Sequence, residues 1–237
     1  MRQPKILRKL GRFVGRPHHG GPPVFVNSMP KAGTNIIEEL LVKLGYKRNR
    51  RRCITEHTLH KAKISPSPGH FYIGHLAQDD CIHNISFTTV YLRRNLWSCL
   101  KSYVNYMYID TRHPVSGYLR ASPTLATIEN LFFCDSNPNA RPLVDEYLLF
   151  DSVHLDRYDC VIDFELLVAM NSNLLLGLSE KLVVSEADLR GSLQDVLASE
   201  SYTKNVGRID IFSSLEADRL VELEARVIDR QQRAFRY

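Results

Sequence analysis

The stretch from residue 24 to residue 44 changes from a strand pattern to a helical pattern, and this change limits the folds open to the chain. Val24-Phe25-Val26 is a short apolar run typical of a buried strand. A polar loop follows, and from Asn35 isoleucine and leucine recur along one helix face until Gly45, a typical helix stop. A strand, a loop and a helix in this order predict the first unit of an α/β fold.

The rest of the chain repeats this alternation. Further strands are expected at residues 71–73, 87–92 and 160–164, and helices at 96–108, 165–178, 185–197 and 214–233. Residues 111–141 carry mixed signals. The alternation predicts a three-layer α/β fold, with a central mainly parallel sheet flanked by helices, in a single domain over residues 23–237. Ligands of such sheets bind beyond the carboxyl ends of the strands.

The loop from Ser28 to Asn35 carries groups that suit a phosphate or a sulfate. A loop that opens a helix presents free backbone N–H groups and the positive end of the helix dipole. Gly33 allows a close approach of the backbone, Thr34 and Asn35 add donors, and Lys31 adds a charge. The loop is not a Walker A motif, because no G-x-x-x-x-G-K-[ST] is present. A plain turn with an exposed lysine fits the same spacing.

A second candidate anion site follows the strand expected at residues 87–92. Arg94 and Asn95 stand at its end, and Ser102 lies two turns along the next expected helix. A guanidinium and a hydroxyl together suit a second phosphate. A serine that merely tolerates a helix face is the alternative.

Together these patterns resemble the sulfotransferases that use PAPS (3′-phosphoadenosine 5′-phosphosulfate). The matching segments are Pro30-Lys31-Ala32-Gly33-Thr34-Asn35, Val90 to Tyr103, Val161 to Leu167 and Lys204-Asn205-Val206-Gly207-Arg208-Ile209. They resemble, in order, the phosphosulfate loop, the 3′-phosphate motif, the strand that ends in aromatic-Glu-x-Leu, and the late loop over the nucleotide. The resemblance covers residues 24 to 212 and implies a P-loop-like fold.

The resemblance also implies roles for individual residues. Lys31 would contact the phosphosulfate and stabilise the leaving phosphate. The donor reacts by itself in this family, so no metal is expected, and the product is PAP, the desulfated nucleotide. The implied nucleotide-binding residues are Lys31, Ala32, Gly33, Thr34 and Asn35 in the first loop, Arg94 and Ser102 for the 3′-phosphate, and Lys204 and Arg208 in the late loop.

A base must accept the proton of the acceptor hydroxyl. Members of the family use a histidine shortly after a strand in a His-Leu-Pro-like context, and Gly74-His75-Leu76 matches two of those positions. An unperturbed histidine titrates near pH 6.5, close to working pH. His75 is therefore the predicted base, with a structural or surface histidine as the alternative. Glu56 is the second candidate base, since other branches of the family use a glutamate.

Several positions depart from the family pattern. Ala32 replaces the common serine, and Ile36 stands where a tryptophan is usual. The late loop has Gly207-Arg208-Ile209 in place of the usual Arg-Lys-Gly run. The chain is also short for the family, so the acceptor site is expected to be open or completed by a second subunit in a homodimer.

The net charge of +5 favours anionic ligands without identifying them. The acceptor is predicted to be a glycan, a glycolipid or a small alcohol, with a phenol or a peptide tyrosine as alternatives. A kinase with a P-loop-like fold and a nucleic-acid-binding domain remain competing classes, although no specific nucleic-acid motif is found. A zinc site would need ligands among Cys53, His57, His60, Cys81 and His83, whose spacing matches no paired zinc motif.

The five cysteines form no C-x-x-C pair, which is typical of reduced thiols in a cytoplasmic protein. No apolar run approaches the roughly 20 residues of a membrane span, and no signal-peptide core is present at the start. Residues 1–22 are predicted to be a basic arm, solvated or in peripheral contact with anionic lipid at the inner face of the membrane.

Overall fold

The computed structural model describes residues 20–49, 53–134, 141–199 and 210–234. Its centre is a sheet whose strands follow the order β2-β4-β1-β5-β6, with β3 also paired to β4. Every strand pair is parallel, which confirms the predicted α/β fold. The strands are β1 (Val24–Ser28), β2 (Lys47–Arg48), β3 (Ile54–Thr55), β4 (His70–His75), β5 (Thr88–Arg93) and β6 (Cys160–Asp163).

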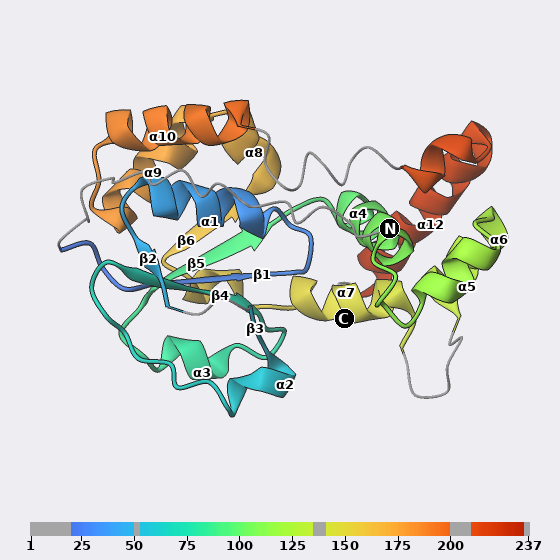
Figure 1. Cartoon of the computed structure of the whole chain (residues 1–237), viewed down its shortest axis with the longest axis horizontal. Helices are drawn as coiled ribbons and strands as arrows, with labels where there is room; N and C mark the ends of the chain where they lie inside the picture. The colour runs from blue at the N-terminus through green and yellow to red at the C-terminus, as the bar shows by residue number, and fades with distance from the viewer. Residues whose placement is uncertain (1–19, 50–52, 135–140, 200–209, 235–237) are drawn as a thin grey trace, which may run out of the picture.

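Helices cover both faces of this sheet, as the prediction of three layers requires (Figure 1). Helices α1, α9 and α10 lie on one face, and the short helices α2 and α3 lie on the other. The helices are α1 (Thr34–Lys43), α2 (Glu56–Leu59), α3 (Asp80–His83), α4 (Leu96–Ile109), α5 (Ser116–Ala121), α6 (Leu125–Phe133), α7 (Leu143–Asp151), α8 (Phe164–Val168), α9 (Ser172–Leu182), α10 (Glu186–Ala198) and α12 (Ala217–Ala234), with 3₁₀ turns η1 (Leu155–Arg157) and η2 (Ile211–Ser214).

Strand β1 lies in the middle of the sheet between β4 and β5, and all five of its residues are buried there. Its side chains alternate between the two faces, as a strand requires. Val24 and Val26 pack in the larger core under α1, α4 and α9, while Phe25 packs in a smaller core with Tyr72 and Phe87. The carboxyl end of β1 therefore opens between β4 and β5, where the predicted anion loop begins.

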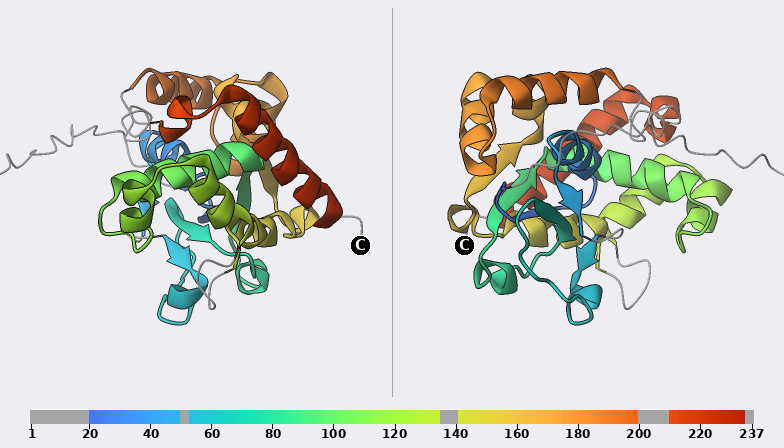
Figure 2. Two further views of the ribbon diagram at one scale, coloured as in Figure 1. Left: turned by 90° about the vertical axis from the view of Figure 1, so that its right-hand side faces the viewer. Right: turned by 60° about the vertical axis from the view of Figure 1, so that its left-hand side comes forward.

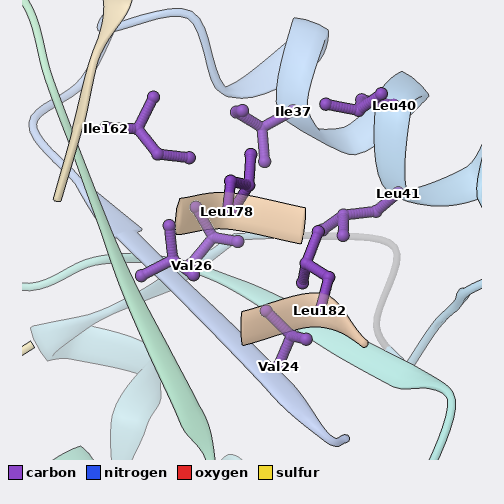
Figure 3. A pocket seen from close by; sticks show the side chains of 9 residues that line it. Val24, Val26, Ile37, Leu40, Leu41, Ile162, Leu178 and Leu182 are labelled. Carbon is purple, nitrogen blue, oxygen red and sulfur yellow. The ribbon is translucent and has the colours of Figure 1, made fainter. Parts of the chain in front are cut away.

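The packing between β1 and the helices α1 and α9 is entirely aliphatic (Figure 3). The side chains that Figure 3 shows surround a void of only about 10 Å³, with no polar group at its wall. A void of this size holds at most one water, and water needs polar partners. This layer of the core therefore serves only to pack the sheet against the helices. A ligand site is expected instead at the carboxyl ends of the strands.

One predicted helix differs from the structure. The helix expected over residues 165–178 is two helices, because Met170 adopts a left-handed conformation (φ 56°) and Asn171 caps the start of α9. Residues 111–134, part of the stretch with mixed signals, contain α5 and α6. The helix expected from residue 185 is confirmed as α10: Ser185 caps its start and accepts a hydrogen bond from the Asp188 N–H. No helix among the described residues combines the length and apolar character needed to cross a bilayer.

Candidate active site

The loop between β1 and α1 approaches its neighbours too closely for any residue but glycine at position 33. Gly33 has φ 105° and caps α1. A Cβ at this position would lie 2.4 Å from Cδ2 and Cε2 of Phe164, the first residue of α8. Such a contact is far inside van der Waals distance, so a side chain at this position would collide with the ring of Phe164. The close approach of the Gly33 backbone to an anion stays a prediction.

Arg94 ties this loop to the end of β5. Its Nη1 donates to the carbonyl oxygen of Lys31 at 3.2 Å, and its guanidinium carbon lies 4.4 Å from the centre of the Phe164 ring. The Nε–H is buried without a hydrogen-bond partner among the described residues, and the nearest carboxylate oxygen, Glu165 Oε1, is 3.8 Å away. The Arg94 side chain as a whole is 26% exposed, so part of its guanidinium is open to a ligand, and a guanidinium suits an anion.

The Lys31 side chain is half-buried and points at an aromatic ring. Its Nζ lies 3.7 Å from the centre of the Tyr106 ring on α4. Burial lowers the pKa of Lys31 below its ordinary value, and the nearby carboxylate of Asp110 partly offsets this effect. No carboxylate of the described residues forms an ion pair with the Lys31 amine, so this group is open to an anionic ligand.

His75 is the last residue of β4 and lies across β1 from Arg94. The sequence placed it after the strand, but it closes the strand. Its Nδ1 is 3.0 Å from the carbonyl oxygen of Ser28 and 3.2 Å from Ser28 Oγ. A carbonyl oxygen can only accept, so Nδ1 carries the proton and Nε2 keeps its lone pair.

Burial lowers the pKa of His75, and the hydrogen bond to the Ser28 carbonyl works against that shift. The charge of Lys31 lowers it further. A lowered pKa keeps the imidazole neutral at pH 7, where it can accept a proton. Both the tautomer and the charge state of His75 therefore suit a general base.

Glu56, the second candidate base, has another role in the structure. Its Oε1 accepts hydrogen bonds from the backbone N–H groups of Ala77 at 2.6 Å and Gln78 at 3.4 Å. The carboxylate is exposed at the start of α2 and holds the turn that follows His75. Its influence reaches His75 through charge, because it raises the pKa of that histidine.

A buried polar network, absent from the sequence analysis, fixes the residues after His75. Asn27 Nδ2 donates to the carbonyl oxygen of Leu76 at 2.8 Å, and Leu76 N–H donates to Asn27 Oδ1 at 2.9 Å. Asn27 Nδ2 also donates to the Tyr158 hydroxyl at 2.8 Å, and that hydroxyl donates to Asp79. His83 Nε2 lies 3.2 Å from Asp79 Oδ2. A network whose members are all satisfied is rigid, so the end of β4 is held in place.

Other residues predicted to bind the nucleotide differ in where they lie. Thr34 and Asn35 open α1 and are half-buried. Ser102 lies on α4, one helical turn before Tyr106, and no described residue makes a hydrogen bond to its hydroxyl. Lys204 and Arg208 lie outside the described residues.

The alternative of a zinc site, raised by the cysteines and histidines of the sequence, finds no support in the described part of the chain. No group of three His, Cys, Asp or Glu side chains there could hold a metal ion. Cys53 instead lies 3.8 Å from Nη2 of Arg48, and His83 pairs with Asp79. Both residues thus take part in contacts with other side chains of the protein.

The fold is that of an α/β protein in which the loop with Lys31, Arg94 and His75 lie at the carboxyl ends of parallel strands. No protein-family model matches the chain, and no curated protein sequence matches it significantly. Among solved structures the chain resembles mouse sulfotransferase SULT7A1, crystallised in complex with PAP, with a TM-score of 0.58 at 11% sequence identity. The similarity covers 89% of this chain and 84% of the mouse chain. The chain therefore has the fold of a sulfotransferase.

Proposed function

We propose that the protein is a PAPS-dependent sulfotransferase, which moves a sulfuryl group to an acceptor hydroxyl and releases PAP. One observation carries the proposal: the Lys31 loop, Arg94 and His75 meet at the carboxyl ends of the three adjacent strands β1, β5 and β4. Sulfuryl transfer between oxygens needs a base for the acceptor hydroxyl and a positive charge for the leaving phosphate, and His75 and Lys31 would supply them.

The loop and Arg94 would bind the nucleotide. The N–H groups that open α1 and the Lys31 ammonium would meet the phosphosulfate end. Arg94, whose buried Nε–H has no hydrogen-bond partner in the described structure, would bind the 3′-phosphate with Ser102. PAPS would supply an activated sulfuryl group, and Lys31 would stabilise the negative charge that builds on the departing phosphate oxygen. A late contribution from Lys204 and Arg208 is part of the same proposal.

His75 would act on the acceptor. Its Nε2 lone pair would take the hydroxyl proton as the acceptor oxygen forms its bond to sulfur. The Ser28 carbonyl then holds the opposite nitrogen and favours the imidazolium that results. Catalysis in this scheme comes from position and charge, as in phosphoryl transfer.

The proposal extends to a glycan, a glycolipid or a small alcohol as the acceptor. The net charge of +5 supports an acidic or membrane-associated substrate. A cytoplasmic location, contact of the basic N-terminus with the inner membrane face and completion of the site in a homodimer belong to this extension. Each stands as a proposal.

The test of the function is calorimetric binding of PAP, with AMP as the comparison and chelator present. We expect PAP to bind at least about tenfold more tightly than AMP, because only PAP offers a 3′-phosphate to Arg94. Arg94→Ala should remove most of this preference. Arg93→Ala is the matched control: this neighbouring arginine is half-exposed and pairs with Asp163, so the preference should persist.

Equal binding of PAP and AMP by the wild-type protein would contradict the 3′-phosphate site and favour the kinase class. If Arg94→Ala still bound PAP more tightly than AMP, the nucleotide site would stand, but residues other than Arg94 would bind the 3′-phosphate.

A further inference from the structure

The ammonium of Lys31 has an aromatic partner where a lysine usually has a carboxylate or water. Its Nζ lies 3.7 Å from the centre of the Tyr106 ring, well inside the roughly 6 Å range of cation–π attraction. No carboxylate of the described residues forms an ion pair with Lys31, and Asp110 acts on it only through longer-range charge. By contrast, Lys43 pairs with Asp195 at 3.1 Å.

The Tyr106 ring is itself held in a fixed orientation. Its hydroxyl donates to Asp110 Oδ2 at 2.9 Å, and Asp110 in turn accepts from Arg112 Nε at 2.9 Å. The ring of Tyr103 stacks on Tyr106 at 6.1 Å and 24°, and His113 meets it edge-on at 6.1 Å and 78°. The surface under Lys31 is therefore formed before any ligand arrives.

The backbone of Lys31 is also constrained. The side chain is therefore held at its backbone end as well as at its ammonium. Lys31 adopts φ 66°, a conformation uncommon for a residue with a Cβ, and Arg94 binds its carbonyl oxygen. A lysine side chain is a flexible four-carbon stem that loses rotamer freedom when it binds. A ring that already restricts this stem lowers that cost.

We propose that Tyr106 is a positioning residue, whose ring holds the Lys31 ammonium at the rim of the nucleotide loop before the donor binds. The inference rests on the proposed function for its purpose, but the contact it describes can be tested without a substrate. Because the ring favours the charged, immobile form of the lysine, removing the ring should expose a freer amine.

The experiment measures acylation of Lys31 by an amine-selective ester at fixed pH, quantified by mass spectrometry on the full chain. Tyr106→Leu should raise the labelling rate of Lys31 by about threefold to tenfold, since a cation–π contact contributes on the order of a tenfold effect. Tyr106→Phe keeps the aromatic face and should label close to the wild-type rate. Tyr108→Leu, the same substitution two residues along α4, should leave Lys31 unchanged.

Lys101 on the same helix is the internal reference. A parallel rise at Lys101 in Tyr106→Leu would mean that α4 has loosened, and together with failed rescue by Tyr106→Phe it would overturn the inference. Equal Lys31 rates in wild type and Tyr106→Leu would overturn it as well.

A second arm separates this inference from the proposed function. Added PAP should protect Lys31 from labelling in the wild-type protein. Without protection the nucleotide site fails, while a faster Lys31 in Tyr106→Leu would still establish the contact. Protection with no effect of Tyr106→Leu would leave the function in place and remove the positioning role.

Discussion

At the scale of single residues, His75 combines two properties that usually have to be arranged separately. The Ser28 carbonyl selects the Nδ1–H tautomer, and burial together with Lys31 lowers the pKa. A buried histidine with a lowered pKa also makes folding sensitive to acid. The unfolded chain takes up a proton near pH 6.5 while the folded chain still resists it, so the free energy of unfolding falls as pH drops below that value.

This direction of the pH dependence of stability leads to a prediction for His75→Gln. We expect the wild-type imidazole to titrate below pH 6.5 by NMR, with the nitrogen shifts of the Nδ1–H tautomer. The variant should lose less of its free energy of unfolding between pH 7 and pH 5 than the wild type, measured by urea denaturation at each pH. An imidazole that titrates above pH 6.5, or identical losses in the two proteins, would contradict the assignment.

Residue patterns within one segment were enough to predict the strand, loop and helix around Lys31 and the place of His75 next to the end of a strand. Both rest on short runs whose chemistry is local: a strand, a loop and a helix start, or a histidine at a strand end. The partners Tyr106 and Phe164 were not predicted. Lys31 meets Tyr106 and Gly33 meets Phe164 across large separations in sequence, and no local spacing encodes such contacts.

At the scale of elements, the end of α9 carries strain in an exposed position. Val183 has φ 56°, and the N–H of Val184 that follows closes the helix by donating to the Ser179 carbonyl at 3.0 Å. This left-handed cap usually holds glycine, because a Cβ there costs about 1–2 kcal/mol. The valine side chain is 64% exposed, so little packing offsets that cost.

We therefore expect Val183→Gly to stabilise the protein by about 1 kcal/mol, measured as the free energy of unfolding in urea. Val183→Ala is the control, since alanine keeps the Cβ and should change stability by less than about 0.5 kcal/mol. A glycine variant that is less stable than wild type would show that the valine contributes contacts which outweigh the strain.

The break between α8 and α9 shows why element boundaries were harder to predict than element types. The sequence over residues 165–178 keeps an apolar pattern and contains no proline at the break. Its one signal is Asn171, whose side chain accepts from the Leu174 N–H and so starts a new helix. Asparagine also occurs inside helices, so this signal alone did not separate one helix from two.

At the scale of the whole molecule, α12 packs against helices that lie beside the candidate site. Figure 2 shows it running obliquely past α4, and it also contacts α7. Leu223 and Val227 are fully buried on its inner side, while Arg230 pairs with Asp145 of α7 at 2.8 Å. Helix α4 carries Tyr106, so α12 supports the side of the candidate site to which this tyrosine belongs.

Leu223→Ala should destabilise the protein by about 2–5 kcal/mol, because the lost side chain leaves a cavity at the α12 contact. Val221→Ala on the same helix is the control: its side chain is 67% exposed, and the change should lie within about 0.5 kcal/mol. Thermal unfolding of both variants distinguishes the two. Equal melting temperatures would mean that α12 contributes little to the folded state.

The central place of β1 has a consequence for the chain as it is synthesised. Among the described residues β1 pairs with β4 and β5 only, and β2 and β3 pair with β4 as well. None of the described strands made before residue 70 therefore has its partner until β4 leaves the ribosome. Until then the apolar side chains of Val24, Phe25 and Val26 and the unpaired edges of β1 are open to other nascent chains, and a pause in translation before that point would prolong the exposure.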